Sequence, residues 1–213
     1  MNTRHIFGRT LPTVAIVLAS LAAGLGLWLG SRAFAPAAMP ALRSALLYPV
    51  PRDIPPFQLK RADGKSLSLA DWKEKWNLVF FGFTHCPDVC PTTLGVLKQV
   101  RATLDTAKLA DRVGMNFISV DPQRDTPEQL ARYAAFFSPD LVAATGEDAE
   151  LTKLTKALGL LYVLTPTANG DYDVDHSASV VIIDPQGRMA GQFRPPLDAA
   201  AISADLIVLA GKK

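Results

Sequence analysis

The sequence predicts an α/β fold, in which helices flank a central sheet, behind an N-terminal transmembrane helix. Three observations lead to this prediction. One segment near the N-terminus is apolar and uncharged, short apolar runs then alternate with helical patterns, and the last third reads as a strand pair followed by a helix. Strands that alternate with helices are typical of a sheet covered by helices on both faces. A length of 213 residues allows one such domain and a small additional part.

The N-terminal apolar segment has the length of a membrane helix. Residues 10–31 contain no charged side chain and are dense in Leu, Ala, Val and Ile. About twenty helical residues cross the roughly 30 Å hydrocarbon core of a bilayer. Arg4 and Arg9 precede the segment with no acidic residue nearby, which favours a cytoplasmic N-terminus. We therefore expect a cytoplasmic tail over residues 1–9, an anchor over residues 10–31 and the rest of the chain outside.

A cleaved signal peptide is the alternative to a retained anchor. Ala33-Phe34-Ala35 loosely resembles a cleavage site. The apolar stretch is long for a signal peptide, and Pro36 would follow the cut awkwardly, so the retained anchor is favoured. The predicted location is a bacterial inner membrane, crossed once, with the C-terminal domain in the periplasm.

The segment after the anchor shows no regular pattern. Residues 32–53 are rich in Ala and Pro, as expected of an extended tether. The folded domain is predicted over residues 54–213. A formal net charge of +2 indicates no basic face for nucleic acid.

The domain begins with a predicted hairpin and a buried strand. Residues 57–60 and 66–69 have the pattern of short strands, and Ala62-Asp63-Gly64-Lys65 is a turn signal between them. Residues 78–83 form a continuous apolar and aromatic run, which indicates a strand buried on both faces.

Two helices and a second buried strand follow. Pro91 suits the first turn of a helix that runs to about residue 107, and residues 116–120 predict the next strand. Thr126 and Pro127 are expected at the N-cap and first position of a helix over residues 128–137.

The remaining elements complete the sheet. Residues 141–144 and 161–164 predict strands, and residues 148–158 predict a helix closed by Gly159. After a polar loop over 166–175, further elements are expected: a strand pair over 179–183 and 189–193 around the turn 184–187, and a helix over 199–209. This order, with a dithiol after the first buried strand, is that of a thioredoxin-like fold.

The chain's two cysteines form that dithiol. Cys86 and Cys90 lie four residues apart, directly after a predicted strand and at the start of a predicted helix. Four helical residues at 1.5 Å each place the two Cα atoms about 6 Å apart, within the range of a disulfide. The helix N-terminus stabilises a thiolate, and Pro87 and Pro91 restrict the loop. The site suits either thiol redox chemistry or a soft metal.

The three histidines differ in their suitability as a third ligand. His5 lies in the predicted cytoplasmic tail and is discarded. His85 neighbours Cys86, and strand alternation would point the two side chains to opposite faces, so packing or hydrogen bonding is favoured. In a thioredoxin-like sheet, the loop before His176 returns over the dithiol. Cys86, Cys90 and His176 would then form an S₂N set suited to Cu(I), with Asp175 as a possible support.

Three spaced motifs resemble those of the Sco/SenC family of copper-binding thioredoxin-like proteins. They are Phe81-Gly82-Phe83-Thr84-His85-Cys86-Pro87-Asp88-Val89-Cys90-Pro91, Ser119-Val120-Asp121-Pro122-Gln123-Arg124-Asp125-Thr126-Pro127, and Asp175-His176-Ser177 before Ile183-Asp184-Pro185-Gln186-Gly187. The resemblance extends from about Ile54 to the C-terminus. It implies binding of Cu(I) and Cu(II) through two cysteines and one histidine, which correspond here to Cys86, Cys90 and His176. For Asp121, Arg124 and Asp125, a buried ion pair that supports the site and a direct role are both open.

Two functions from different classes follow. The first is a membrane-anchored copper metallochaperone; the resemblance implies that it assists assembly of the dinuclear copper site of cytochrome c oxidase. Its partner would be the copper-bearing subunit of that oxidase or another copper client protein. The alternative is a thiol–disulfide oxidoreductase that keeps a client's cysteines reduced, with Cys86 and Cys90 as its redox pair; the three-residue separation of these cysteines favours copper. A peroxidase-like activity and a purely structural disulfide are weaker alternatives.

Overall fold

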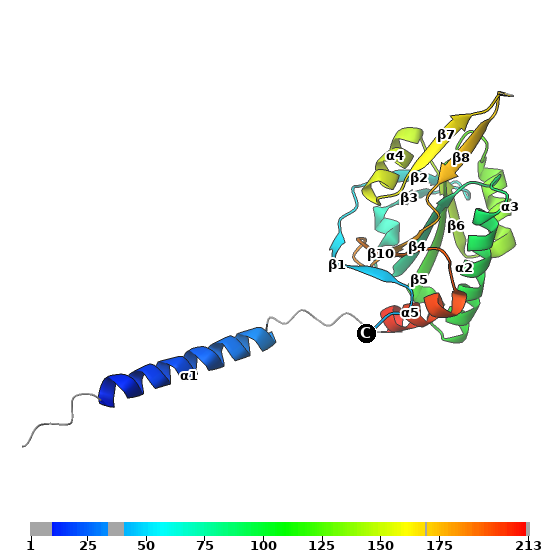
Figure 1. Ribbon diagram of the computed structural model, residues 1–213. Coiled ribbons are helices and arrows are strands. Elements are labelled where there is room, and N and C mark those ends of the chain that lie inside the picture. Colours follow the sequence, from blue (N-terminus) through cyan, green and yellow to red (C-terminus); the bar gives the residue numbers. More distant parts are fainter. Residues whose placement is uncertain (1–9, 34–40, 169, 212–213) are drawn as a thin grey trace, which may run out of the picture. The chain divides into compact units, whose positions relative to one another are not determined.

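The computed structural model describes residues 10–33, 41–168 and 170–211 (Figure 1). The chain divides into two compact units, Met1–Pro40 and Ala41–Lys213, and each is described by itself. The predicted cytoplasmic tail, His5, and residues 34–36 of the cleavage-site alternative lie outside the described residues.

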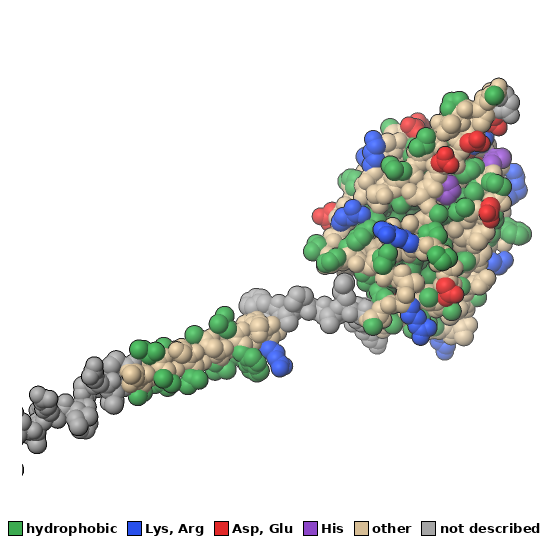
Figure 2. All heavy atoms as spheres, in the orientation of Figure 1, with side chains coloured by type: hydrophobic (Ala, Val, Ile, Leu, Met, Phe, Trp, Pro, Cys, Tyr) green, Lys and Arg blue, Asp and Glu red, His purple; other side chains and the backbone are tan. Residues whose placement is uncertain are grey.

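The first unit contains one long helix, α1 (Thr10–Ala33). Its segment Thr13–Arg32 has a mean hydropathy of 2.0 over 20 residues, which is long and apolar enough to cross a membrane. Hydrophobic side chains are spread along its visible length (Figure 2). Arg32 lies in its last turn. Length and composition therefore agree with the predicted anchor and equally with a signal sequence.

The second unit is built on an eight-stranded sheet with the order β1-β10-β9-β4-β5-β6-β2-β3. The strands are β1 (Leu46–Arg52), β2 (Gln58–Arg61), β3 (Ser66–Ser68), β4 (Trp76–Gly82), β5 (Val113–Ser119), β6 (Leu141–Thr145), β9 (Val180–Ile183) and β10 (Met189–Phe193). β4, β5 and β6 are parallel, whereas β9 pairs with β4 antiparallel. A separate two-stranded sheet of β7 (Tyr162–Pro166) and β8 (Tyr172–His176) projects from one end of the unit (Figure 1).

Helices cover both faces of the sheet, so the central strands are buried on both sides. The helices are α2 (Val89–Thr106), α3 (Pro127–Phe137), α4 (Asp148–Ala157) and α5 (Ala199–Gly211), with 3₁₀ turns η1 (Leu69–Trp72) and η2 (Ala110–Arg112). Leu78 and Phe80 of β4 enter the core under α2, α3 and α5, whereas Val79 and Phe81 enter the core under η1 and α4. The continuous apolar run predicted as a buried strand is confirmed.

Local signals placed several helix ends correctly. Thr126 caps α3 by accepting a hydrogen bond from the Gln129 backbone N–H, and the Gln129 side chain accepts one from the Thr126 N–H in return. Gly159 adopts a φ of 67° after α4, the left-handed conformation that a closing glycine permits. α2 begins at Val89, so Cys90 and Pro91 both lie in its first turn, as predicted for Pro91.

The tether predicted over residues 32–53 is too long at its C-terminal end. Residues 46–52 form β1, which pairs antiparallel with β10. Asp205 of α5 accepts hydrogen bonds from the backbone N–H groups of Arg43, Ser44 and Ala45, which ties the preceding residues to the same unit. β1 lacks a strand-like pattern because it is an edge strand that contains Pro49 and Pro51 and buries no side chain completely.

The polar loop predicted over residues 166–175 is also wrong in part. Its second half is β8, in which Val174 is buried while Asp173 and Asp175 are exposed. Aspartate is depleted in strands, and this obscured the alternation of Tyr172, Val174 and His176 with the two acidic residues.

Candidate metal site

Cys86 and Cys90 lie where the chain passes from the C-terminal end of β4 into α2. Both are free thiols; Cys90 is fully buried and Cys86 is half-buried. The backbone N–H of Cys90 donates to the Cys86 sulfur, with 3.4 Å between nitrogen and sulfur. The predicted position of the pair at a helix N-terminus is therefore observed, but the thiolate stabilisation expected there is outweighed at Cys90, where burial raises the pKa of the thiol.

Gly82, the last residue of β4, makes room for the buried sulfur. A Cβ atom at this position would lie 2.5 Å from the Cys90 Sγ, closer than real Cβ contacts. Only a residue without a side chain allows the sulfur to pack directly against the end of the strand.

His176 closes the site from the other side. It is the last residue of β8, and its Nε2 lies 3.3 Å from the Cys90 Sγ. The ring stands edge-on to Phe80 and Phe83, at centroid distances of 5.9 and 5.8 Å. Nδ1 faces the Ser177 carbonyl oxygen at 3.2 Å, so a proton on Nδ1 would leave the Nε2 lone pair directed at the sulfur. The structure thus brings together the three residues that the sequence predicted as ligands.

The donor set has the chemistry of a soft-metal site. One ligand atom each from Cys86, Cys90 and His176 lies within 4.8 Å of the other two. Burial raises the pKa of the Cys90 thiol and lowers the pKa of His176. A neutral imidazole is ready to coordinate, whereas the thiol must lose its proton, so binding of a metal would release protons.

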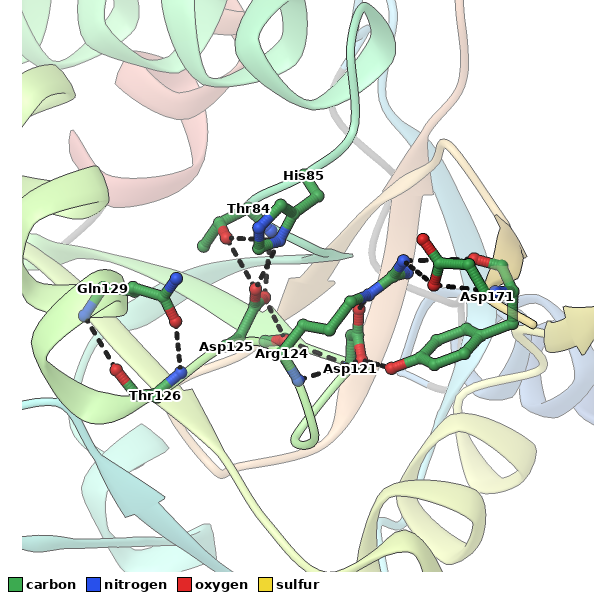
Figure 3. A network of polar contacts seen from close by, with 10 residues as sticks. Thr84, His85, Asp121, Arg124, Asp125, Thr126, Gln129 and Asp171 are labelled. Atoms are coloured by element: carbon green, nitrogen blue, oxygen red, sulfur yellow. Dashed lines mark hydrogen bonds and ion pairs between the residues drawn. The ribbon is translucent and has the colours of Figure 1, made fainter. Parts of the chain in front are cut away.

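Asp125 holds the loop that carries Cys86. Its carboxylate accepts hydrogen bonds from the Thr84 backbone N–H at 2.9 Å, the Thr84 hydroxyl at 2.6 Å and the Ser119 hydroxyl at 2.6 Å (Figure 3). The Nδ1 of His85 lies 3.5 Å from the same carboxylate. The hydrogen-bonding role favoured for His85 agrees with this position, and His85 is not part of the Cys86–Cys90–His176 group.

Asp121 and Arg124 hold the hairpin that carries His176. The Tyr172 hydroxyl donates to Asp121 at 2.5 Å, and the Arg124 Nε donates to the same carboxylate at 2.6 Å. The Arg124 Nη1 also donates to the Tyr172 carbonyl oxygen at 3.1 Å, and the guanidinium carbon lies 4.0 Å from the centre of the Tyr172 ring. Burial, together with the hydrogen bond to Asp121, raises the pKa of Tyr172 to about 12. Of the two roles left open for these residues, the structure shows an ion pair that supports the site.

The loop after β5 therefore positions both halves of the site. The sequence identified its charged residues but not their partners Thr84 and Tyr172, which lie about 40 and 50 positions away. The sequence signal that could have identified Tyr172 is the alternation of Tyr172 and Val174 with two acidic residues before His176.

A family model described as SCO1/SenC matches residues 50–210. The chain belongs to the SCO1/SenC family.

Curated relatives agree with this membership. A putative copper-binding protein of Stutzerimonas stutzeri is 37% identical over 154 residues, which are 72% of this chain and 75% of that protein. The mitochondrial SCO1 homolog of Homo sapiens is 38% identical over 139 residues, which are 65% of this chain but only 46% of the human protein.

Solved SCO1/SenC structures share the fold. Bradyrhizobium japonicum ScoI with copper bound superposes with a TM-score of 0.67 at 39% identity. The alignment covers 74% of this chain and 99% of the ScoI chain. The apo Sco1 protein from Thermus thermophilus superposes with a TM-score of 0.71 at 34% identity and covers 81% and 99%. The predicted thioredoxin-like α/β fold is confirmed.

Three other acidic residues, Asp121, Asp125 and Asp175, lie outside the Cys86–Cys90–His176 group. His85, Asp121 and Asp125 also lie within 4.8 Å of one another, but both carboxylates already accept hydrogen bonds, and Arg124 supplies a positive charge to Asp121. Asp175 is exposed, and among the described residues it makes no hydrogen bond to His176, whose Nδ1 faces the Ser177 carbonyl instead. The support expected from Asp175 is therefore limited to the effect of its charge.

Proposed function

We propose that this protein is a membrane-anchored copper metallochaperone whose ligands are Cys86, Cys90 and His176. The observation that carries the proposal is the convergence of two sulfur atoms and one imidazole nitrogen within 4.8 Å of one another. Two thiolates and an imidazole suit Cu(I), and they leave a tetrahedral zinc site one ligand short.

The three ligands differ in solvent exposure, and this difference suits the transfer of a bound metal ion to another protein. Cys90 is fully buried, and Phe80 and Phe83 flank the His176 ring, so protein atoms shield one side of the site from solvent. Cys86 is half-buried and lies in an exposed stretch with Pro87 and Asp88. A recipient protein would approach this sulfur and replace the ligands one at a time.

The recipient is the copper-bearing subunit of cytochrome c oxidase or another copper client protein. Family membership supports this assignment, and related proteins have been solved with copper bound, among them Arabidopsis thaliana ScoI. The anchor over residues 10–31 would hold the domain on the periplasmic side of a bacterial inner membrane. The length and hydropathy of α1 support this location, and a related Bacillus anthracis protein is described as a SCO1/SenC family lipoprotein.

A thiol–disulfide oxidoreductase is the second candidate, supported by the unequal exposure of the two free thiols. The accessible Cys86 would attack a client disulfide, and the buried Cys90 would then displace the client thiol. The client cysteines would end reduced and the Cys86–Cys90 pair oxidised, so a thiol reductant would be needed for each further turnover.

Copper titration of the full-length protein in detergent, under reducing conditions, tests the proposal. We expect one equivalent of Cu(I) in the wild type. His176→Ala should weaken Cu(I) binding by more than tenfold, because a ligand is lost. His85→Ala is the matched control and should bind copper as the wild type does. If His176→Ala keeps its copper affinity but no longer reduces a client disulfide, the oxidoreductase should replace the chaperone.

A further inference from the structure

The outer edge of β8 carries backbone groups that β7 does not use. Within the described part of the chain, β8 pairs with β7 alone, in an antiparallel ladder. Next to this ladder, the Ser177 N–H donates to the Leu161 carbonyl oxygen at 3.0 Å. Because bonded and non-bonded pairs alternate in an antiparallel sheet, every second residue of β8 directs its backbone groups away from β7. These outward N–H and C=O groups belong to Tyr172, Val174 and His176.

A groove of about 430 Å³ separates this edge from the loop that carries the dithiol. β8 lines one side of the groove, and the dithiol loop lines the other side with Phe83, His85 and Pro87. Arg124 lies in the same groove, and its Nη1 donates to the Tyr172 carbonyl oxygen at 3.1 Å. Since that oxygen points away from β7, the outer edge of β8 faces the groove.

Part of this edge is available for a further strand. Arg124 already occupies the edge at Tyr172. Farther along, the N–H and C=O groups of Val174 have no partner across the groove among the described residues. The Val174 side chain is buried in the core, so only the backbone of this residue faces the groove. Unpaired strand edges bind extended segments, because the backbone of such a segment continues the ladder.

The side chains on both sides of Val174 are acidic. Asp173 and Asp175 are exposed and line the groove, and neither forms an ion pair with a described residue. In an added antiparallel strand, the residues opposite these two aspartates project from the same face of the sheet, where opposite charges stabilise the ladder. The edge therefore favours an extended segment with basic side chains at alternate positions. A second copy of β8 would instead place acidic residues against acidic ones.

We propose that the outer edge of β8 binds an extended, basic segment of the copper recipient, which adds as an antiparallel strand beside Val174. Lysine or arginine side chains of that segment would lie opposite Asp173 and Asp175. This inference rests on the proposed function. β8 ends at the ligand His176, and the loop that carries Cys86 lines the other side of the groove, so the docked segment would bring the recipient to the metal ligands.

Peptide binding tests the inference. The full-length protein in detergent, labelled with isotopic valine, would be titrated with a blocked peptide of the sequence valine-lysine-valine-lysine-valine. In the antiparallel ladder, the central valine exchanges two hydrogen bonds with Val174, and the lysine N–H groups point away from β8. We expect the NMR signal of the Val174 N–H to shift and its exchange with solvent to slow by roughly tenfold, because it gains a hydrogen bond.

Methylation of one peptide nitrogen tests the ladder. A methyl group on the central valine nitrogen removes a hydrogen bond to the Val174 carbonyl oxygen, so binding should weaken by about tenfold. The matched control carries the methyl group on a lysine nitrogen and should bind as the parent peptide does. Equal losses with the two methylated peptides would overturn the inference.

Asp173→Lys tests the charge of the partner. This variant should bind the lysine peptide roughly threefold less tightly and should prefer a peptide with glutamate in place of lysine. Asp140→Lys, at an exposed position outside the groove, is the matched control and should keep the wild-type preference. An unchanged preference in Asp173→Lys would overturn the basic character of the segment.

Two further results would overturn the inference. One is a Val174 signal that does not move with the lysine peptide. The other is exchange of the Val174 N–H that slows at higher protein concentration without peptide, because a second copy of the chain would then occupy the edge. If the wild type takes up no copper, the proposed function fails; if it takes up copper but does not bind the lysine peptide, only this inference fails.

Discussion

The Tyr172 hydroxyl donates a 2.5 Å hydrogen bond to Asp121, and this bond joins the hairpin that carries His176 to the loop that follows β5. Asp125 in the same loop accepts two hydrogen bonds from Thr84, two residues before Cys86. The relative position of the imidazole and the dithiol therefore depends on one loop that contains none of the three ligands.

Tyr172→Phe should weaken copper binding without altering any ligand. The hairpin would lose its bond to Asp121 and hold His176 less firmly, and the loss of such a supporting bond typically costs 10- to 100-fold in metal affinity. The Cu(I) dissociation constant measures this, with the thiol count as a check that both cysteines remain reduced. Tyr48→Phe serves as the control. Equal affinities in Tyr172→Phe and the wild type would show that the hairpin is held by other contacts.

Gly82→Ala should destabilise the domain and weaken the site. The added methyl group would displace the Cys90 sulfur, and overpacking of this kind costs about 1–3 kcal/mol. Urea unfolding and copper affinity are the measurements. Gly95→Ala is the matched control, because a Cβ in this α2 position meets no atom within 4 Å. That control should raise the free energy of unfolding by about 0.5–1 kcal/mol.

Asp205→Asn should destabilise the folded unit at neutral pH. Burial opposes ionisation of Asp205, but hydrogen bonds from the N–H groups of Arg43, Ser44 and Ala45 outweigh it and lower the pKa. Losing hydrogen bonds to a charged group costs about 2 kcal/mol in the free energy of unfolding. Urea unfolding measures the loss, and the exposed Asp140→Asn is the control.

The same carboxylate predicts a pH dependence. Because its pKa is lower in the folded state, its contribution is complete above the ordinary aspartate pKa of about 3.9 and is lost as the pH falls through the folded value. The difference in unfolding free energy between the wild type and Asp205→Asn should therefore be largest near pH 7 and shrink below about pH 4. A difference that stays constant with pH would contradict the role of the charge.

The full-length protein should remain with membranes after an alkaline carbonate wash, because α1 is long and apolar enough to span a bilayer. Immunoblotting of the pellet and the supernatant measures how much protein stays with the membranes. A peripheral membrane protein, which the wash releases, is the control. A soluble mature form that begins near Pro36 would show instead that the segment is a cleaved signal peptide.

The features that the sequence predicted well depend on neighbouring residues. Three features are of this kind: the buried run of β4, the capping of α3 by Thr126 and the dithiol at the start of α2. Each of them is determined by residues that lie within a few positions of one another in the sequence. Patterns weaken where a strand lies at an edge or carries acidic residues, and β1 and the second half of the predicted polar loop were missed for those reasons.

By itself, the sequence determined that a cysteine pair lies at a helix N-terminus in an α/β fold, because a short segment dictates that geometry. Only the tertiary structure decided how His176 reaches Cys90 across 86 positions, because this contact depends on the hairpin and on the Asp121–Arg124–Tyr172 cluster. It also decided the depth of the Cys90 sulfur beside Gly82, because packing between β4, β5 and α2 sets that space and no local pattern encodes it.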